Sequence, residues 1–237
     1  MNKVIFSVLL SFLLFTSCDD HEAVDLGIHS GYILCDDGVV MSDQAFFAQD
    51  FSGKNYKFPA AVIFTEQLDG SEDMTRLLAV SIIELPQLQF CDSFSMSQGT
   101  NTDINAAAGN KNTIALQNSY DTKLGHGSPL AAYVFAHDYY GKSIFIPSVK
   151  ELKMLYAQKG RVNAVLQRIN EQLPGSADLL FTEARSDSCW YWSSTEVAAN
   201  PTKQAWIFSM SSGTSQECPK IESHAARAVV PYYPYNQ

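Results

Sequence analysis

Five cysteines and five histidines are the residues of this chain best suited to catalysis or metal binding. No two cysteines have the C-x-x-C spacing that is common in zinc sites, and the histidines are scattered along the chain. The sequence also contains no G-x-S-x-G, H-E-x-x-H, P-loop or dinucleotide-binding pattern. We therefore expect no catalytic residues, no metal and no cofactor, and we expect that the protein is not an enzyme. The histidines are His21, His29, His126, His137 and His224.

A cluster of aromatic rings beside small hydroxyl side chains, CWYWSSTE at 189–196, is the other candidate for a ligand site. The rings have two interpretations: they fill the core between a sheet and helices, or they face solvent and stack on a sugar or peptide. Tyr191 and Trp192 alternate on a short strand, and burial of such a ring removes about 150–250 Å² from water. We favour the core for Tyr191, Trp192 and Trp206.

The first residues indicate export. Lys3 precedes an apolar run at 4–15 that ends in Thr16 and Ser17. This layout is typical of a secretory signal peptide, and the run is too short to span a membrane. The small residues before Cys18 resemble the lipobox of bacterial lipoproteins, in which the signal is removed and the cysteine is acylated. The resemblance implies a signal peptide at 1–17, a lipid anchor at Cys18, a tether at 18–30 and a single domain at 31–237. The alternative is an ordinary signal peptide followed by a chance cysteine.

The acidic residues after Cys18 bear on where the protein is located, and its net charge bears on which classes of partner it can bind. Asp19 and Asp20 directly follow Cys18, which in some bacterial groups resembles a signal for surface display and in others a signal for retention at the inner membrane. We favour a lipid anchor in the outer membrane with display on the cell surface. The formal net charge of −9 argues against a nucleic-acid partner, which needs basic patches.

Four cysteines remain after Cys18, and an exported chain can hold them as disulfides. Three connectivities are open. We favour Cys189–Cys218, which flank the predicted strand pair around AWIFSM, with Cys35–Cys91 as its complement.

Hydrophobic patterns predict strands first and helices afterwards. GYILCDDGVVMS is typical of a hairpin with an Asp-Gly turn, and β-branched runs at 59–67 and 76–85 extend it into an antiparallel meander. Residues 90–118 are rich in Ser, Asn, Thr and Gly, which predicts a long irregular loop.

Three helices are expected next. One begins at the cap Ser128 and ends near Gly141, one spans SVKELKMLY with a Ser148–Glu151 capping box, and one covers about 161–172. Strands return at YWSST, 205–210, TSQEC and 224–232. The pattern therefore predicts an α+β domain with antiparallel sheets and two to three helices.

Four segments, IPSVKELKMLY, YWSSTE, AWIFSMSSG and ARAVV, resemble in order and spacing a family of exported bacterial domains. The family is named after the C-terminal domain of a Legionella collagen-like adhesin, and it is frequent in surface lipoproteins and fimbrillin-like proteins of gut bacteria. Its fold is similar to the C-type-lectin-like superfold, and the resemblance covers roughly residues 30–233. Two positions depart from it: SIFIPS lacks the usual Trp before the Pro motif, and Ala226 replaces a Val. The resemblance implies that the structural motif comprises Pro147, Ser148, Glu151, Tyr191, Trp192, Ser193, Trp206 and Arg227.

Loops on such a scaffold usually carry recognition. The candidate surface is the loop region 92–118 together with the loop around 184–203, and Trp190 is the best candidate for an exposed ring because it precedes the family motif. Candidate binding residues are Trp190, Asn101, Asp103 and Asn200.

The expected function is thus a non-catalytic cell-surface binding or adhesion module. Its partner is a membrane through the lipid anchor, and beyond it a glycan, a peptide, or a host or matrix protein. One alternative is an accessory subunit of a fimbria, with fimbrial subunits as partners. The other is an enzyme of the formylglycine-generating type, which shares a similar superfold and uses paired cysteines, although nothing around Cys189 or Cys218 matches its active-site pattern.

Overall fold

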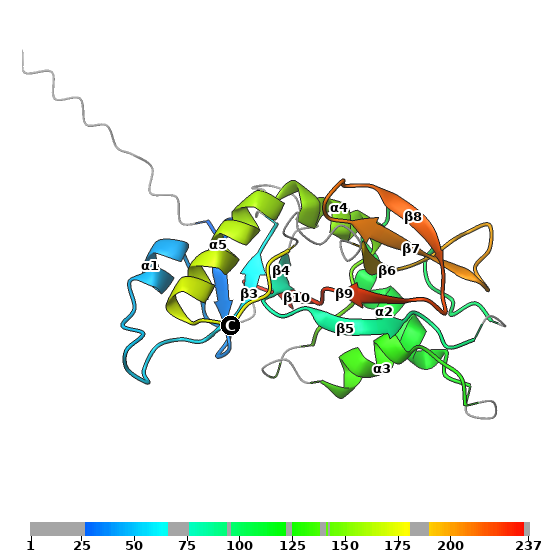
Figure 1. Ribbon diagram of the computed structural model, residues 1–237, viewed down its shortest axis with the longest axis horizontal. Helices are drawn as coiled ribbons and strands as arrows, with labels where there is room; N and C mark the ends of the chain where they lie inside the picture. The colour runs from blue at the N-terminus through cyan, green and yellow to red at the C-terminus, as the bar shows by residue number, and fades with distance from the viewer. Residues whose placement is uncertain are drawn as a thin grey trace, which may run out of the picture.

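The computed structural model describes residues 27–65, 76–93, 96–121, 125–137, 141, 143–180 and 190–234. The predicted signal peptide, Cys18, most of the tether and Cys189 lie outside these ranges. The described residues form two five-stranded sheets and five helices, which confirms the α+β class (Figure 1). The presence of five helices instead of two to three is a correction, and the C-type-lectin-like type stays a prediction.

The strands are β1 (Ile33–Cys35), β2 (Val40–Met41), β3 (Pro59–Ile63), β4 (Leu77–Ser81), β5 (Leu85–Gln89), β6 (Trp190–Glu196), β7 (Gln204–Ser209), β8 (Ser215–Pro219), β9 (Ser223–Ala226) and β10 (Val229–Tyr232). The helices are α1 (Asp43–Phe47), α2 (Gly109–Asn118), α3 (Pro129–Ala136), α4 (Val149–Ala157) and α5 (Lys159–Gln172).

The first sheet has the strand order β10-β4-β3-β1-β2, and all its neighbours are antiparallel. The predicted hairpin is confirmed: β1 and β2 are joined through Asp36, Asp37 and Gly38, and Gly38 has a φ of 88°. A positive φ at this position suits glycine, which has no Cβ to clash.

The second sheet has the order β5-β9-β6-β7-β8. Its pairs are antiparallel except β6–β9, which is parallel with Tyr191 opposite Ala225. The expectation of purely antiparallel sheets is therefore wrong at this pair.

The apolar run 224–232, predicted as one strand, is two strands in different sheets. The break falls at Arg227, whose buried guanidinium donates from Nε to the Ser81 carbonyl at 2.9 Å and from Nη2 to the carbonyls of Ile82, at 3.0 Å, and Asp178. These hydrogen bonds fix the position of the segment that leaves β9 and enters β10. Arg227 therefore stabilises the point at which the chain passes from one sheet to the other.

The helices cover the sheets on different sides. In Figure 1, α5 lies beside the first sheet, and α2 and α3 lie against the second, while α4 contacts β6 and β7. The predicted caps are present: Ser128 caps α3, and Ser148 and Glu151 form a capping box on α4. The described part of α3 ends at Ala136 rather than near Gly141.

The core consists of two clusters, and strand alternation explains how the aromatic stretch serves both. Tyr191 is fully buried in one cluster and Trp192 is fully buried in the other. Successive strand residues point to opposite faces of a sheet. The core prediction for these two rings is therefore confirmed, whereas Trp206 is only half-buried.

Candidate functional site

The candidate site is built around Glu196, the last residue of β6, whose side chain is fully buried. Its carboxylate accepts hydrogen bonds from the backbone N–H groups of Gln98 and Thr100 at 2.7 and 2.9 Å. The hydroxyls of Ser97 and Thr100 donate to it at 3.0 Å each. A buried carboxylate is costly unless it is hydrogen-bonded, so these contacts hold residues 97–100 against the end of β6.

Lys220, directly after β8, supplies the opposite charge. Its ammonium is fully buried and contacts the Glu196 carboxylate, the side-chain carbonyl of Gln98 and the backbone carbonyl of Pro201. Burial lowers the pKa of Lys220, and the Glu196 carboxylate opposes that shift. We call this pair the Glu196–Lys220 clamp. It joins the two loop regions that the sequence singled out as a recognition surface.

A hollow of about 290 Å³ lies between the loop 101–108 and the first turn of α2. Alanine side chains make part of its wall, and amide and cationic side chains make the rest. The lining residues are Arg76, Asn101, Ala106, Ala107, Ala108, Asn110 and Lys111.

Buried side chains anchor the loop that borders this hollow. The Asn112 side-chain oxygen accepts from the N–H of Asn101 at 2.8 Å, and the Ser148 hydroxyl donates to the Ala106 carbonyl at 2.9 Å. Glu151 Oε2 accepts from the N–H of Gly109 at 3.1 Å. Asn112, Ser148 and Glu151 are almost fully buried. The shape of the hollow is therefore set before any ligand arrives.

The four predicted binding residues do not form one patch. Asn101 lines the hollow and is exposed. Its side-chain oxygen accepts from the N–H of Asp103, and the Asp103 carboxylate accepts from the N–H of Asn105, so both side chains also shape the loop. Asn200 donates to Gln204 at 3.3 Å. Trp190 is half-buried against the core, which corrects the expectation of an exposed ring.

Most residues of the structural motif are buried and hydrogen-bonded, whereas Trp206 is half-buried. Ser193 donates to the Trp206 carbonyl at 2.8 Å, and the Pro147 carbonyl accepts from the N–H of Ser194 at 2.8 Å. Burial raises the pKa of Glu151, which accepts from the N–H of Ser148 at 2.7 Å. The buried members are Pro147, Ser148, Glu151, Tyr191, Trp192, Ser193 and Arg227.

Gly109 gives the first testable prediction. A Cβ at this position would lie 2.2 Å from Glu151 Oε2 and 2.7 Å from the Phe145 ring. We expect Gly109→Ala to lower the free energy of unfolding by about 1–3 kcal/mol, because overpacking of a close contact is destabilising. Urea denaturation measures the change.

Gly160 is the matched control. It also lies near the start of a helix, α5, but a Cβ there would meet nothing within 4 Å. Gly160→Ala should leave stability unchanged or raise it by about 0.5–1 kcal/mol, since alanine favours helix. Equal effects of the two substitutions would contradict the proposed contact between Gly109 and Glu151.

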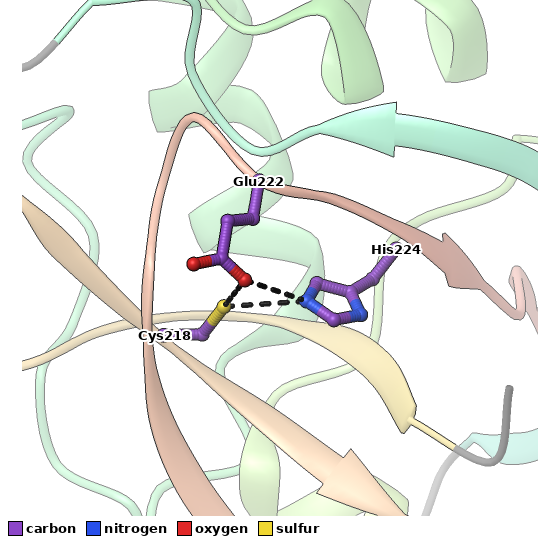
Figure 2. Close-up of side chains that lie close together, drawn as sticks. All are labelled: Cys218, Glu222 and His224. Atoms are coloured by element: carbon purple, nitrogen blue, oxygen red, sulfur yellow. Dashed lines mark hydrogen bonds and ion pairs between the residues drawn. The ribbon is translucent and has the colours of Figure 1, made fainter. Parts of the chain in front are cut away.

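A second group of side chains, absent from the sequence-based expectations, lies where the chain turns from β8 into β9 (Figure 2). Cys218 Sγ is 3.2 Å from His224 Nε2 and 3.4 Å from Glu222 Oε2, and these last two atoms are 3.6 Å apart. Cys218 is buried, His224 is partly buried and Glu222 is exposed. The sequence signal is the short spacing Cys-x-x-x-Glu-x-His, which a search for C-x-x-C or H-E-x-x-H patterns does not detect.

The pKa shifts of Cys218 and His224 indicate how these side chains are protonated near neutral pH. Burial, followed by the Glu222 carboxylate, raises the pKa of the Cys218 thiol to about 12. Burial lowers the pKa of His224. The thiol is therefore protonated and the imidazole neutral near pH 7. A protonated thiol is a poor nucleophile.

The predicted Cys35–Cys91 disulfide is absent, which is a correction. Cys35, Cys91 and Cys218 are free, buried thiols. Cys35 belongs to one core cluster and Cys91 to the other, so their sulfurs do not pair. Cys189, the suggested partner of Cys218, lies outside the described residues.

No protein-family model matches the chain, and no curated protein matches it. Within the described ranges, no helix has the length and apolar character needed to cross a membrane.

Proposed function

We propose that this protein is a lipoprotein, anchored through Cys18 in the outer membrane and displayed at the cell surface, whose domain binds a partner without catalysis. We also propose that its α+β domain is of the C-type-lectin-like type. One observation supports the binding role most: the hollow beside α2 is bordered by a loop that buried side chains hold in place. A pre-formed site avoids the entropic cost of ordering a loop when the ligand binds.

The side chains around the hollow indicate the chemistry of the ligand. Asn101 and Asn110 offer amides that donate and accept hydrogen bonds, and Arg76 and Lys111 offer positive charge on a chain with a net charge of −9. Arg76 also lies 3.7 Å from Glu151, which leaves Lys111 as the more accessible cation. A ligand with several hydroxyls and a carboxylate fits these groups, and an acidic glycan has that chemistry.

An array experiment tests the binding role. Full-length protein in detergent is applied to immobilised acidic glycans, neutral glycans and matrix proteins. We expect binding to the acidic glycans, and we expect the double substitution Asn101→Ala, Lys111→Ala to weaken it by at least about tenfold, which corresponds to about 1.4 kcal/mol. Lys54→Ala, at an exposed lysine between α1 and β3, is the control that should bind normally. Binding that survives the double substitution, or no binding to any probe, would contradict the proposal.

The anchor gives a separate prediction. Cys18→Ala removes the only thiol that the lipobox resemblance assigns to acylation. We expect the variant to lose incorporation of labelled fatty acid and to move from the membrane fraction to the soluble fraction, since a lipid chain supplies the membrane affinity. Cys35→Ala, which changes a buried thiol of the domain, should remain acylated. If Cys18→Ala still fractionates with membranes, the lipoprotein assignment is wrong.

A further inference from the structure

We propose that Cys218, Glu222 and His224 form a binding site for a zinc ion. The first argument is the distances among their ligand atoms, which are 3.2, 3.4 and 3.6 Å. Tetrahedral zinc with usual bond lengths to sulfur, nitrogen and oxygen separates its ligands by about 3.4–3.6 Å. The three atoms therefore already occupy approximately one face of a zinc tetrahedron.

The second argument is the identity of the ligands. A thiolate, an imidazole and a carboxylate together suit zinc better than calcium or magnesium, which prefer oxygen ligands alone. Magnesium in particular demands octahedral oxygen coordination, and a buried thiol such as Cys218 does not provide it. Zinc binding would release the thiol proton, because the thiolate is the form that binds the metal.

The third argument is that the surrounding structure holds these side chains in place. The turn that carries Glu222 is closed by a hydrogen bond from its N–H to the Pro219 carbonyl at 3.0 Å. His224 is paired with Leu88 of β5, and its ring packs against Trp192 in a T-shaped arrangement with centroids 5.1 Å apart. Such support is what orients the ligands of natural metal sites.

Three protein ligands leave the fourth zinc position open, as in zinc sites that bind water or another ligand. Glu222 is exposed, so at least one of the three ligand residues is in contact with solvent. The same turn contains Lys220 of the Glu196–Lys220 clamp. A bound ion would therefore fasten the two ends of the segment that carries the clamp lysine. This inference stands independently of the proposed lipid anchor and glycan binding.

Metal titration tests the site. Full-length protein in detergent, treated with a chelator and kept in a non-thiol reductant, is titrated with Zn²⁺ by calorimetry and with Co²⁺ by absorption spectroscopy. We expect one Zn²⁺ per chain and a sulfur-to-cobalt charge-transfer band with Co²⁺. Cys218→Ala should abolish that band, and His224→Ala should weaken Zn²⁺ binding at least about 100-fold.

Variants at the surface keep the test independent of folding. Glu222 is exposed, so Glu222→Gln should fold normally and still weaken Zn²⁺ binding by about tenfold or more. Glu217→Gln changes an exposed carboxylate on β8, and Cys91→Ala changes another buried thiol; both should bind Zn²⁺ as the wild type does. Absence of stoichiometric Zn²⁺ binding, or binding that Glu222→Gln and His224→Ala leave unchanged, would overturn the proposal.

Discussion

Replacing Lys220 with methionine is expected to lower the free energy of unfolding by about 3–5 kcal/mol, because it leaves the buried charge of Glu196 without its counter-charge. The carbonyl oxygens of Gln98 and Pro201 would lose a donor at the same time. The four hydrogen bonds that Glu196 accepts from residues 97–100 remain. The expected destabilisation therefore comes from the lost charge pair rather than from the whole network. Chemical denaturation measures the effect.

Two further variants isolate the ion pair. Lys203→Met removes an exposed lysine nearby in the sequence and should change stability by less than about 0.5 kcal/mol. The double variant Lys220→Met, Glu196→Gln should recover part of the loss, because a neutral amide replaces the uncompensated charge. If Lys220→Met costs no more than Lys203→Met, the clamp does not contribute as described.

Trp192→Ala is the second substitution with a large expected effect, about 3–5 kcal/mol of destabilisation. The ring is fully buried, contacts Phe90 with centroids 5.4 Å apart, and donates from Nε1 to the Leu88 carbonyl at 2.8 Å. Its removal would leave a cavity at the junction of β5, β6 and β9. It would also remove the ring that packs on His224, so Zn²⁺ binding should weaken in parallel.

Trp190→Ala is the control within the same strand. Trp190 is half-buried at the start of β6, so its loss should cost clearly less than the loss of Trp192. The destabilisation caused by Trp192→Phe should lie between those of Trp190→Ala and Trp192→Ala, because phenylalanine keeps an aromatic ring in the core but loses the hydrogen bond to Leu88. Equal destabilisation by Trp190→Ala and Trp192→Ala would contradict the different packing of the two rings.

Local signals explain which parts of the fold could be predicted. The β1–β2 hairpin depends on an Asp-Gly turn, and the start of α4 depends on a capping box, so both follow from neighbouring residues. The placement of Tyr191 and Trp192 in different core clusters follows from their alternation in a strand.

Helix α2 shows why other parts were missed. Its sequence, GNKNTIALQN, begins with glycine and contains three asparagines, and its N-cap residue, Ala108, makes no side-chain capping bond. These residues have low helix propensity. The helix is held instead by tertiary contacts, including the bond from Gly109 to Glu151 and the burial of Leu116. Neither contact is visible within a local sequence window.

The sequence does not reveal the contacts made by the buried charged residues, because their partners are distant in the chain. Glu196 and Lys220 are 24 residues apart, and a lysine in a polar turn is normally exposed. Arg227 breaks an apolar run through bonds to carbonyls of Ser81 and Ile82, which are distant in the chain. Asn101 belongs to a loop whose composition is visible in the sequence, but the hollow that it lines also needs Arg76, which is distant in the chain.

Hydrogen exchange at two backbone amides tests the central claim most directly, namely that the Glu196–Lys220 clamp holds residues 97–100 in a fixed shape. The N–H groups of Gln98 and Thr100 donate to the buried carboxylate of Glu196. We predict that both amides exchange slowly in the wild type, and that Lys220→Met accelerates them more than it accelerates the amide of Val62 in β3. Rapid exchange of Gln98 and Thr100 in the wild type would contradict the account, since it would mean that the loop opens freely.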